Sequence, residues 1–398
     1  MIPLMKNAFL NEIETREKLA SFIGSSPKFS MDVKCAEFER LFARFQKRKF
    51  AVLVNSGASA NLVLLQALKN LGRLQDGDKI GFSAVTWSTN TMPIIQLGMV
   101  PIPVDCQPET LNCMSNNLLA TLEKEELRAF FITNALGLTG DLPAIRSICR
   151  KKGIILLEDN CESLGTELPE GMAGNFGDAS TFSFFVAHHM STIEGGMVCT
   201  DDEDLAEMLI ICRANGWDRN LNALQQKKWR NRFNIRGQFE AKYSFYELGF
   251  NLRPTEITGF LGIFQMQFLV ENIKMRQENY NFIEKFIKEN PDLICLDHSH
   301  ISLLSNFALP VMCKTPQLRE YYLGQFSGAG IEIRPIIAGN MAKQPFFKKF
   351  TEVEYSLPGA DFIHDCGFYC GNYPELTPAD LETISSCLIY NPDKSILS

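Results

Sequence analysis

The sequence lacks long hydrophobic runs and any excess of positive charge, and both absences exclude classes of protein. No apolar run reaches the ~20 residues that a membrane-spanning helix needs. The formal net charge is -7. This argues against broad binding to nucleic acid or to anionic membranes, although a local basic groove remains compatible with it. The stretch "MIPLMKNAFLNEIETREK" has no basic segment followed by an apolar core, so we expect no signal peptide and a cytoplasmic protein.

Cysteine pairs at metal-site spacing are also missing. The chain has 12 cysteines, and most stand singly in apolar segments, which is typical of reduced core thiols in a cytosolic enzyme. The closest pair, Cys366 and Cys370, is a C-x3-C motif with no second pair at a suitable distance. We therefore expect no metal site.

What the sequence does contain is enough apolar material for a large core. With 398 residues, 45% of them hydrophobic, it predicts one large domain with a smaller companion. From about residue 35 to 200, helical patterns such as "CAEFERLFARF" alternate with short apolar runs bounded by Gly, Pro, Asn or Asp. This alternation predicts a mainly parallel sheet wrapped by helices. The predicted strands lie at 50–54, 79–84, 99–105, 127–133, 153–159 and 180–186.

The second half of the chain changes in composition. Segment 203–246 is polar and basic, and it predicts either an excursion from the core that faces substrate or a solvated surface helix. Residues 253–289 predict one or two long helices, and strands and short helices follow Pro291. We divide the chain into an N-terminal segment 1–30, a large domain 31–265, and a small C-terminal domain 266–398 that includes the long connecting helix.

Two motifs at the carboxyl ends of predicted strands could bind a phosphorylated ligand, since ligands of parallel sheets bind at that edge. In "VNSGASAN" (54–61), Gly57, Ala58 and Ser59 would offer backbone N–H groups at a helix N-terminus, where phosphate binds favourably, although many such turns look alike. In "IILLEDNCES" (154–163), Asp159 stands at the strand tip. It could hold a protonated ring nitrogen or cap a following helix.

Two further motifs carry polar side chains. "TFSFFVAHH" ends in His188 and His189, with the hydroxyl of Ser183 a few residues earlier. A single histidine is more often structural than catalytic, but its place one strand after Asp159 favours a function. "LGFNLRPTEITG" (248–259) contains an Asn-x-Arg that could reach a phosphate or simply precede a capped helix.

The order of these motifs, together with the aromatic "TW" at 86–87 and "EGG" at 194–196, resembles the DegT/StrS-type family of sugar aminotransferases and dehydratases. The resemblance spans roughly residues 30–390. It implies an α/β protein with the aspartate-aminotransferase (type I) fold: a large domain with a mainly parallel sheet and a smaller C-terminal α+β domain. It also implies the cofactor pyridoxal 5'-phosphate.

The resemblance assigns residues around the cofactor ring. Asp159 matches the family's partner of the pyridinium nitrogen. Glu162 matches a position, commonly Gln, beside the ring hydroxyl, and Trp87 matches an aromatic residue that stacks on the ring.

The resemblance also assigns residues to the cofactor phosphate. Gly57, Ala58 and Ser183 match its contacts within one subunit. Asn251 matches a contact that comes from the neighbouring subunit, so a homodimer is implied.

The sequence departs from the family pattern at one position. Alignment of "SFFVAHHMSTIEGG" on the family's S-F-x3-K-x5-E-G-G places His188 where the aminotransferases have the lysine that bonds the cofactor covalently. Imidazole has no primary amine, so the cofactor must be held noncovalently. Pyridoxamine 5'-phosphate then becomes the natural resting form, and His188 is suited to general-base work.

Within the family, a histidine at this position marks the sugar 3-dehydratases. One branch carries a two-iron cluster on cysteines after the histidine, but this chain has no cysteine between Cys212 and Cys295. The sequence is therefore most similar to the GDP-4-keto-6-deoxymannose 3-dehydratases of colitose synthesis, which need no iron. By the same resemblance, Arg219 and Arg334 are candidate substrate-binding residues.

The implied reaction is the removal of the C3 hydroxyl from a nucleotide-linked 4-keto-6-deoxysugar, GDP-linked by preference. L-glutamate supplies the amine, His188 removes a proton from the cofactor's C4′ carbon, and ammonia and a 3-deoxy-4-ketosugar are released for a surface polysaccharide such as lipopolysaccharide or capsule. Two alternatives stay open: a nucleotide-sugar aminotransferase that works without lysine, and an inactive family member with a regulatory role.

Overall fold

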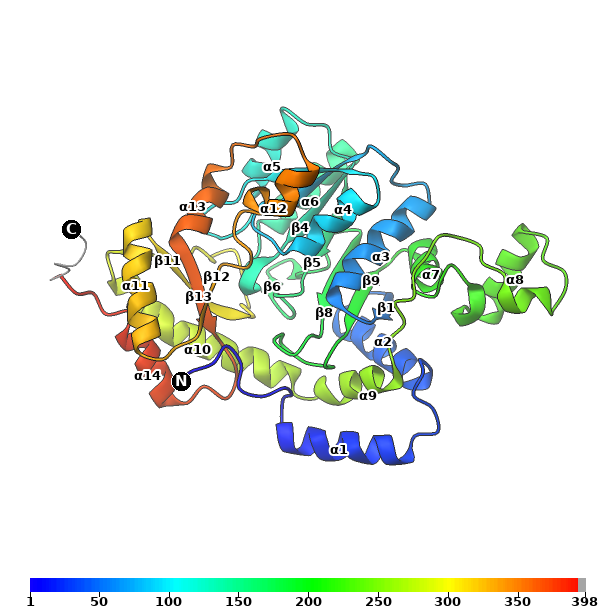
Figure 1. The fold of residues 1–398 in the computed structure, drawn as a ribbon, viewed down its shortest axis with the longest axis horizontal. Helices are drawn as coiled ribbons and strands as arrows, with labels where there is room; N and C mark the ends of the chain where they lie inside the picture. Colours follow the sequence, from blue (N-terminus) through cyan, green and yellow to red (C-terminus); the bar gives the residue numbers. More distant parts are fainter. Residues whose placement is uncertain (393–398) are drawn as a thin grey trace.

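A computed structural model of the chain describes residues 1–392 and shows a sheet covered by helices on both faces, with a second, smaller sheet beside it (Figure 1). The large sheet has the strand order β1-β9-β8-β5-β4-β2-β3. Only β9 runs antiparallel to its neighbours. The strands are β1 Phe50–Val54, β2 Lys79–Ser83, β3 Val100–Val104, β4 Ala129–Thr133, β5 Ile155–Asp159, β8 Ala179–Ser183 and β9 Gly196–Thr200.

The predicted mainly parallel sheet is thus confirmed, and all six predicted strands are present. β9 was not predicted, because its run "GMVCT" is short and follows directly on the Gly-rich turn. Nearly every residue of these strands is buried, which explains why they read as continuous apolar runs rather than as alternating patterns.

Helices cover the large sheet, and a helix follows most of the parallel strands. They are α1 Glu12–Ser25, α2 Val33–Phe45, α3 Gly57–Asn70, α4 Met92–Gln96, α5 Ser115–Leu122, α6 Leu142–Lys152, α7 Glu203–Cys212 and α9 Glu256–Gln265. The helix predicted from "CAEFERLFARF" is α2, whose Phe38 and Phe42 are fully buried against Phe182 and Phe184 of the sheet. A short hairpin, β6 Glu167–Leu168 and β7 Gly171–Met172, lies between β5 and β8 in the chain.

Part of the predicted excursion at 203–246 is wrong. The first ten residues form α7, which packs on α3 and β1 with Leu205, Met208 and Leu209 buried. The rest leaves the body of the protein as the arm that we define as residues 217–247, with helix α8 Ala223–Arg232 at its tip (Figure 1, right). A β-bridge between Trp217 and Phe245 closes the arm at its base.

The predicted long helical region is two helices, α9 and α10 Leu269–Glu289. The C-terminal sheet then has the order β10-β11-β13-β12 and is antiparallel throughout. Its elements are β10 Leu293–Ile294, β11 Ala308–Cys313, α11 Pro316–Gly328, β12 Ile333–Pro335, α12 Pro345–Phe350, α13 Pro358–Cys366, β13 Gly367–Gly371 and α14 Pro378–Ser386. One hydrophobic core joins the two sheets, with Phe130 and Ile132 of β4 in the same cluster as Leu309 and Val311 of β11. The large sheet and small sheet are therefore held in a fixed relation.

Candidate active site

A cavity of about 340 Å³ opens at the carboxyl ends of the parallel strands. Loops that follow β1, β2, β4, β5 and β8 form most of its wall, and the small sheet's side closes it with Phe307, Ile337 and Tyr369. The other lining residues are Ser56, Gly57, Ala58, Trp87, Thr89, Asn90, Thr133, Asp159, Cys161, Glu162, Ser183, Phe185, Ala187, His188 and Glu194.

One end of the cavity is suited to an anion. Helix α3 begins there, and its N-cap Ser56 accepts a hydrogen bond from the amide of Ser59 at 3.0 Å. The amides of Gly57 and Ala58 lie in the first turn of α3 and have no intrahelical acceptor, so they can bind a ligand. Ser183 accepts the amide of Phe185 at 3.3 Å and keeps its own proton to donate. A Cβ on Gly57 would lie 2.6 Å from the Cβ of Ser183, so only glycine allows this close approach.

Asp159 lies deeper in the cavity and is only 5% exposed. Its Oδ2 accepts hydrogen bonds from the side-chain amides of Asn61 (3.0 Å) and Asn90 (2.7 Å), and its Oδ1 accepts the amide of Cys161 at 2.9 Å. Both carboxylate oxygens therefore have hydrogen-bond donors that hold the side chain in place. No helix follows β5 directly, so the alternative in which Asp159 caps a helix is wrong.

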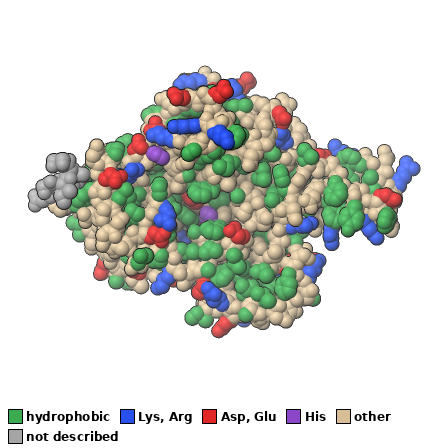
Figure 2. Space-filling model, viewed as in Figure 1, with side chains coloured by type: hydrophobic (Ala, Val, Ile, Leu, Met, Phe, Trp, Pro, Cys, Tyr) green, Lys and Arg blue, Asp and Glu red, His purple; other side chains and the backbone are tan. Residues whose placement is uncertain are grey.

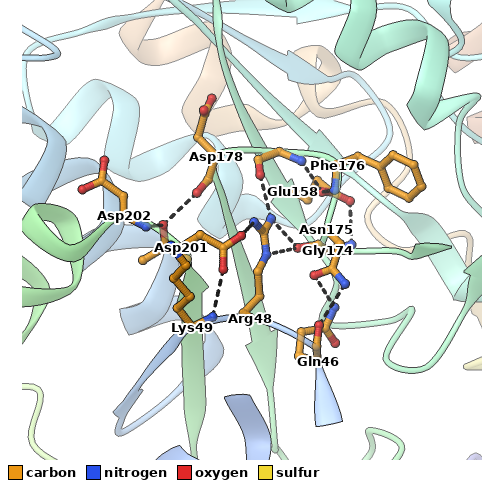
Figure 3. A network of polar contacts seen from close by, with 12 residues as sticks. Gln46, Arg48, Lys49, Glu158, Gly174, Asn175, Phe176, Asp178, Asp201 and Asp202 are labelled. Carbon is orange, nitrogen blue, oxygen red and sulfur yellow. Dashed lines mark hydrogen bonds and ion pairs between the residues drawn. The ribbon is translucent and has the colours of Figure 1, made fainter. Parts of the chain in front are cut away.

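Glu158, the acid next to Asp159, is fully buried, and because side chains alternate along a strand it points to the opposite side of β5. Its hydrogen-bond network is drawn in Figure 3. Glu158 accepts the amides of Gly174, Phe176 and Gly177 at 2.6–2.8 Å. Burial raises its pKa, and these three donors oppose the rise. Arg48 completes the network by donating to the carbonyls of Gly174 and Gly177. Glu158 therefore anchors a loop, and Asp159 alone of the two acids faces the cavity.

Glu162 faces the same cavity and accepts the amide of Leu136 at 2.9 Å. Burial, together with the negative charge of Asp159, raises the pKa of Glu162 to about 7. A substantial fraction of the side chain is therefore protonated at neutral pH. It can donate a hydrogen bond to a ligand oxygen in that form or accept one when ionised.

The two histidines of "AHH" have different surroundings. His188 lines the cavity, partly buried, with its ring 5.2 Å from that of Phe307. His189 is fully buried away from it, and its Nε2 lies 3.1 Å from the carbonyl oxygen of Ser305. Burial and then the charge of Arg276 lower the pKa of His188 to about 4, so its ring is neutral at physiological pH and can accept a proton. Only the first histidine is placed to meet a ligand.

Trp87 forms part of the cavity rim and is 56% exposed, so its indole face is available for stacking. The structure thus brings together Gly57, Ala58, Trp87, Asp159, Glu162, Ser183 and His188, which lie in one cavity.

Three predicted residues lie outside this cavity. Asn251 is exposed at the base of the arm, where its backbone bridges to Ala214. Arg219 is on the arm, 5.2 Å from the ring of Trp217. Arg334 is exposed on β12 and pairs with Glu332, but it lies opposite Tyr369 of the cavity wall in the strand register. A capped helix does follow this segment, but its N-cap is Thr255, so Asn251 does not cap α9.

Sequence reasoning missed several residues of the site. Asn61 is four residues after Gly57 and so lies on the same face of α3, which is a signal that could have been used. Asn90, Phe307 and Tyr369 belong to motifs without distinctive spacing. Phe307 and Tyr369 come from the C-terminal sheet, and only the tertiary fold brings them to the cavity.

These residues fit a phosphorylated pyridine cofactor. The α3 N-terminus with Ser183 suits a phosphate, and the triply hydrogen-bonded Asp159 suits a protonated ring nitrogen. None of the residues lining the cavity is a lysine. Among residues 1–392 there is also no group of three or more His, Cys, Asp or Glu side chains arranged to hold a metal ion.

The fold and this cavity define a protein of the aminotransferase type with a site for pyridoxal phosphate. Residues 12–389 match the model of the DegT/DnrJ/EryC1/StrS aminotransferase family, and the chain belongs to that family. The predicted family and fold class are thereby confirmed.

Known proteins of the family resemble this chain along most of its length. GDP-4-keto-6-deoxy-D-mannose 3-dehydratase of Yersinia pseudotuberculosis is 35% identical over 359 residues, which cover 87% of this chain and 88% of that protein. A crystal structure of GDP-4-keto-6-deoxymannose-3-dehydratase with a trapped PLP–glutamate geminal diamine has a TM-score of 0.88 at 31% identity, covering 98% of this chain and 100% of that one. A His-to-Asn mutant of the same enzyme with bound GDP-perosamine has a TM-score of 0.87 at 30% identity, with the same coverage.

Proposed function

We propose that this protein is a pyridoxal-phosphate-dependent 3-dehydratase of a nucleotide-linked 4-keto-6-deoxysugar, with L-glutamate as amine donor. The observation that carries the proposal is the cavity itself. It combines an anion site, the hydrogen-bonded carboxyl group of Asp159 and the imidazole of His188, and no lysine lines it. A family member without the lysine cannot bond its cofactor covalently, which favours dehydration over amine transfer.

In the proposed reaction, four of the residues that line the cavity and the amide of Ala58 hold the cofactor. Gly57, Ala58 and Ser183 hold the cofactor phosphate, and Trp87 covers the ring. Asp159 keeps the ring nitrogen protonated. Bound in this way, pyridoxamine phosphate supplies the amine that reacts with the C4 ketone and a ring that accepts electrons.

The remaining groups act on protons and hydrogen bonds. His188 accepts the proton whose removal precedes loss of the C3 hydroxyl, since its ring is neutral at physiological pH. Glu162 holds the ring hydroxyl. Phe185 and Phe307 flank the imidazole and limit the access of water to it.

GDP is the favoured nucleotide because 3-dehydratases similar to this chain are named for, or were crystallised with, GDP-linked sugars. Arg334, which pairs in the strand register with Tyr369 of the cavity wall, is a candidate contact for the sugar diphosphate. In the part of the chain that the structure describes, no helix is long and apolar enough to span a membrane. A cytoplasmic site of action and a product used for lipopolysaccharide or capsule stay predictions.

We also propose that the active site is completed across a homodimer. Asn251 and Arg219 cannot line the cavity of their own chain, yet both belong to or adjoin the arm. The arm and its base expose large apolar side chains, visible in green at the right of Figure 2. They include Leu224, Phe239, Tyr243, Phe245 and Leu248, each at least 59% exposed. Such a surface favours burial against a second copy.

The proposed reaction is tested with a panel of GDP-, CDP- and TDP-linked 4-keto-6-deoxysugars, each offered with glutamate. For the GDP-linked sugar we expect equal amounts of 2-oxoglutarate, ammonia and a sugar that is one oxygen atom lighter. The reaction should need no iron–sulfur reductase. An aminosugar without free ammonia would identify an aminotransferase, and a purified protein that neither binds the cofactor nor turns over would identify an inactive family member.

The shared site is tested by mixing two variants. Loss of the Asn251 amide removes one hydrogen bond to a charged acceptor, worth about 1.5–3 kcal/mol. Asn251→Ala should therefore retain cofactor roughly ten- to a hundredfold more weakly, at ~1.4 kcal/mol per decade. After dissociation and reassociation with inactive His188→Asn, one of the two sites in each mixed dimer has both residues intact. About one quarter of wild-type activity should return in an equimolar mixture. Mixed dimers that form but stay inactive would contradict a shared site.

A further inference from the structure

Arg276 of α10 is a buried cation directly behind the histidine loop, residues 185–192. Its side chain is 4% exposed. Together with His188 and His189 it borders a small cavity of about 20 Å³ on the side of the loop away from the active site. No carboxylate within ion-pair distance of Arg276 occurs in residues 1–392. Burying a guanidinium without a carboxylate in contact costs free energy. We therefore expect a role of Arg276 beyond packing.

The hydrogen bonds of Arg276 join three segments around the two histidines. Its Nη1 donates to the carbonyl of Phe307 at 2.9 Å and to that of Asn372. Its Nε donates at 2.9 Å to the side chain of Asn272, whose amide in turn donates to the carbonyl of His189. Phe307 is also the residue whose ring lies against His188. Arg276 thus fixes both the backbone of the histidine loop and the aromatic ring that packs on the imidazole.

Other titratable groups also lie around His188. His189 belongs to the same loop and Glu194 follows it, Asp159 ends β5 and Glu162 lies just after it, and Tyr369 comes from β13. Glu375 faces Arg276 from beyond β13 and partly offsets its charge. Burial of the ring is the largest influence that lowers the pKa of His188, and Arg276 is the next. The carbonyl of Cys161 opposes both.

We propose that Arg276 is a positioning residue for His188: its hydrogen bonds order the histidine loop and the backbone of Phe307, and its fixed positive charge lies behind the imidazole. This inference rests on the proposed role of His188 as the base. Arg276 does not line the active-site cavity, so it acts through the histidine. The arrangement explains why a buried arginine here hydrogen-bonds only carbonyl and amide oxygens: a carboxylate partner would cancel the charge.

The test is the titration of His188 by NMR in the full-length, cofactor-loaded protein without sugar substrate. The signal is assigned by its disappearance in His188→Asn. In the wild type the pKa of His188 should lie below its ordinary value, because the ring is buried and the charge of Arg276 lies behind it. Arg276→Gln removes the charge, and the midpoint should rise by about one pH unit. Arg276→Lys keeps the positive charge but loses the guanidinium N–H groups that donate to three segments. The titration midpoint of His188 in this variant should stay close to that of the wild type. The acid limb of kcat/KM should move in parallel.

An unmoved midpoint in folded Arg276→Gln would overturn the inference, as would an equal rise in Arg276→Lys, which would point to packing alone. Where Arg276→Gln does not fold, Glu375→Gln decides. This partly exposed residue offsets the charge of Arg276, so its neutralisation should lower the midpoint, and an unchanged value would count against the inference. Because no sugar is present, the titration stands whatever the substrate panel shows about the reaction.

Discussion

Replacement of His188 by asparagine is expected to abolish sugar dehydration while the cofactor stays bound. His188 is the only histidine in the wall of the cavity, and general-base catalysis typically contributes 10²–10⁴ in rate. Asparagine has no basic nitrogen at neutral pH, so the full factor should be lost. The phosphate and ring contacts through Ser183 and Asp159 do not involve His188 and should survive. Single-turnover product formation and cofactor stoichiometry measure the two effects separately.

His189→Asn is the matched control for this prediction. His189 is fully buried and interacts with the carbonyl of Ser305, so its loss should destabilise the fold by about 1–3 kcal/mol. The rate per folded molecule should change much less than in His188→Asn. If His189→Asn were the inactive variant and His188→Asn kept most of its activity, the assignment of the base would be wrong by one residue.

Asp159→Asn is expected to lower the dehydration rate by about 10²–10³, the range found when one preorganised electrostatic partner of a reacting group is removed. The carboxylate now accepts three hydrogen bonds and presents its negative charge to the cavity. An amide of the same shape carries no charge to hold a ring proton. It also turns an NH2 group towards the amides of Asn61 or Cys161, which adds a donor–donor conflict. Cofactor affinity should fall together with the rate.

Glu158→Gln provides the comparison, because Glu158 is adjacent in sequence but does not line the cavity. Its carboxylate binds only the backbone of residues 174–177 and the side chain of Asn134. The variant should lose stability in thermal unfolding and keep the rate per folded molecule. A rate for Asp159→Asn within tenfold of the wild type would show that the cavity does not need this charge.

Much of the site followed from the sequence because its residues occupy local positions. Gly57 and Asp159 each stand at the end of an apolar run, and parallel strands bring such ends to one edge of a sheet. Ser183 lies within the predicted strand 180–186, and only the structure shows that the strand ends there. The substitution of histidine for lysine at position 188 is likewise visible in a single motif. The residues that were missed, Phe307 and Tyr369, reach the cavity across more than a hundred residues of chain, and no local pattern encodes that contact.

The sequence by itself determined the parallel sheet, the order of the cofactor motifs and the absence of a lysine, since each depends on residue type and short-range spacing. Two pairs of adjacent residues could not be told apart by residue type alone, and only the tertiary structure decided which member of each pair faces the cavity. His188 faces the cavity and His189 the core, and Asp159 faces the cavity while Glu158 holds a loop. Adjacent residues differ in the direction of their side chains, and that direction is fixed by strand alternation and by what packs on either side. The charge behind His188 is also a tertiary feature, because Arg276 comes from a helix 88 residues further along the chain.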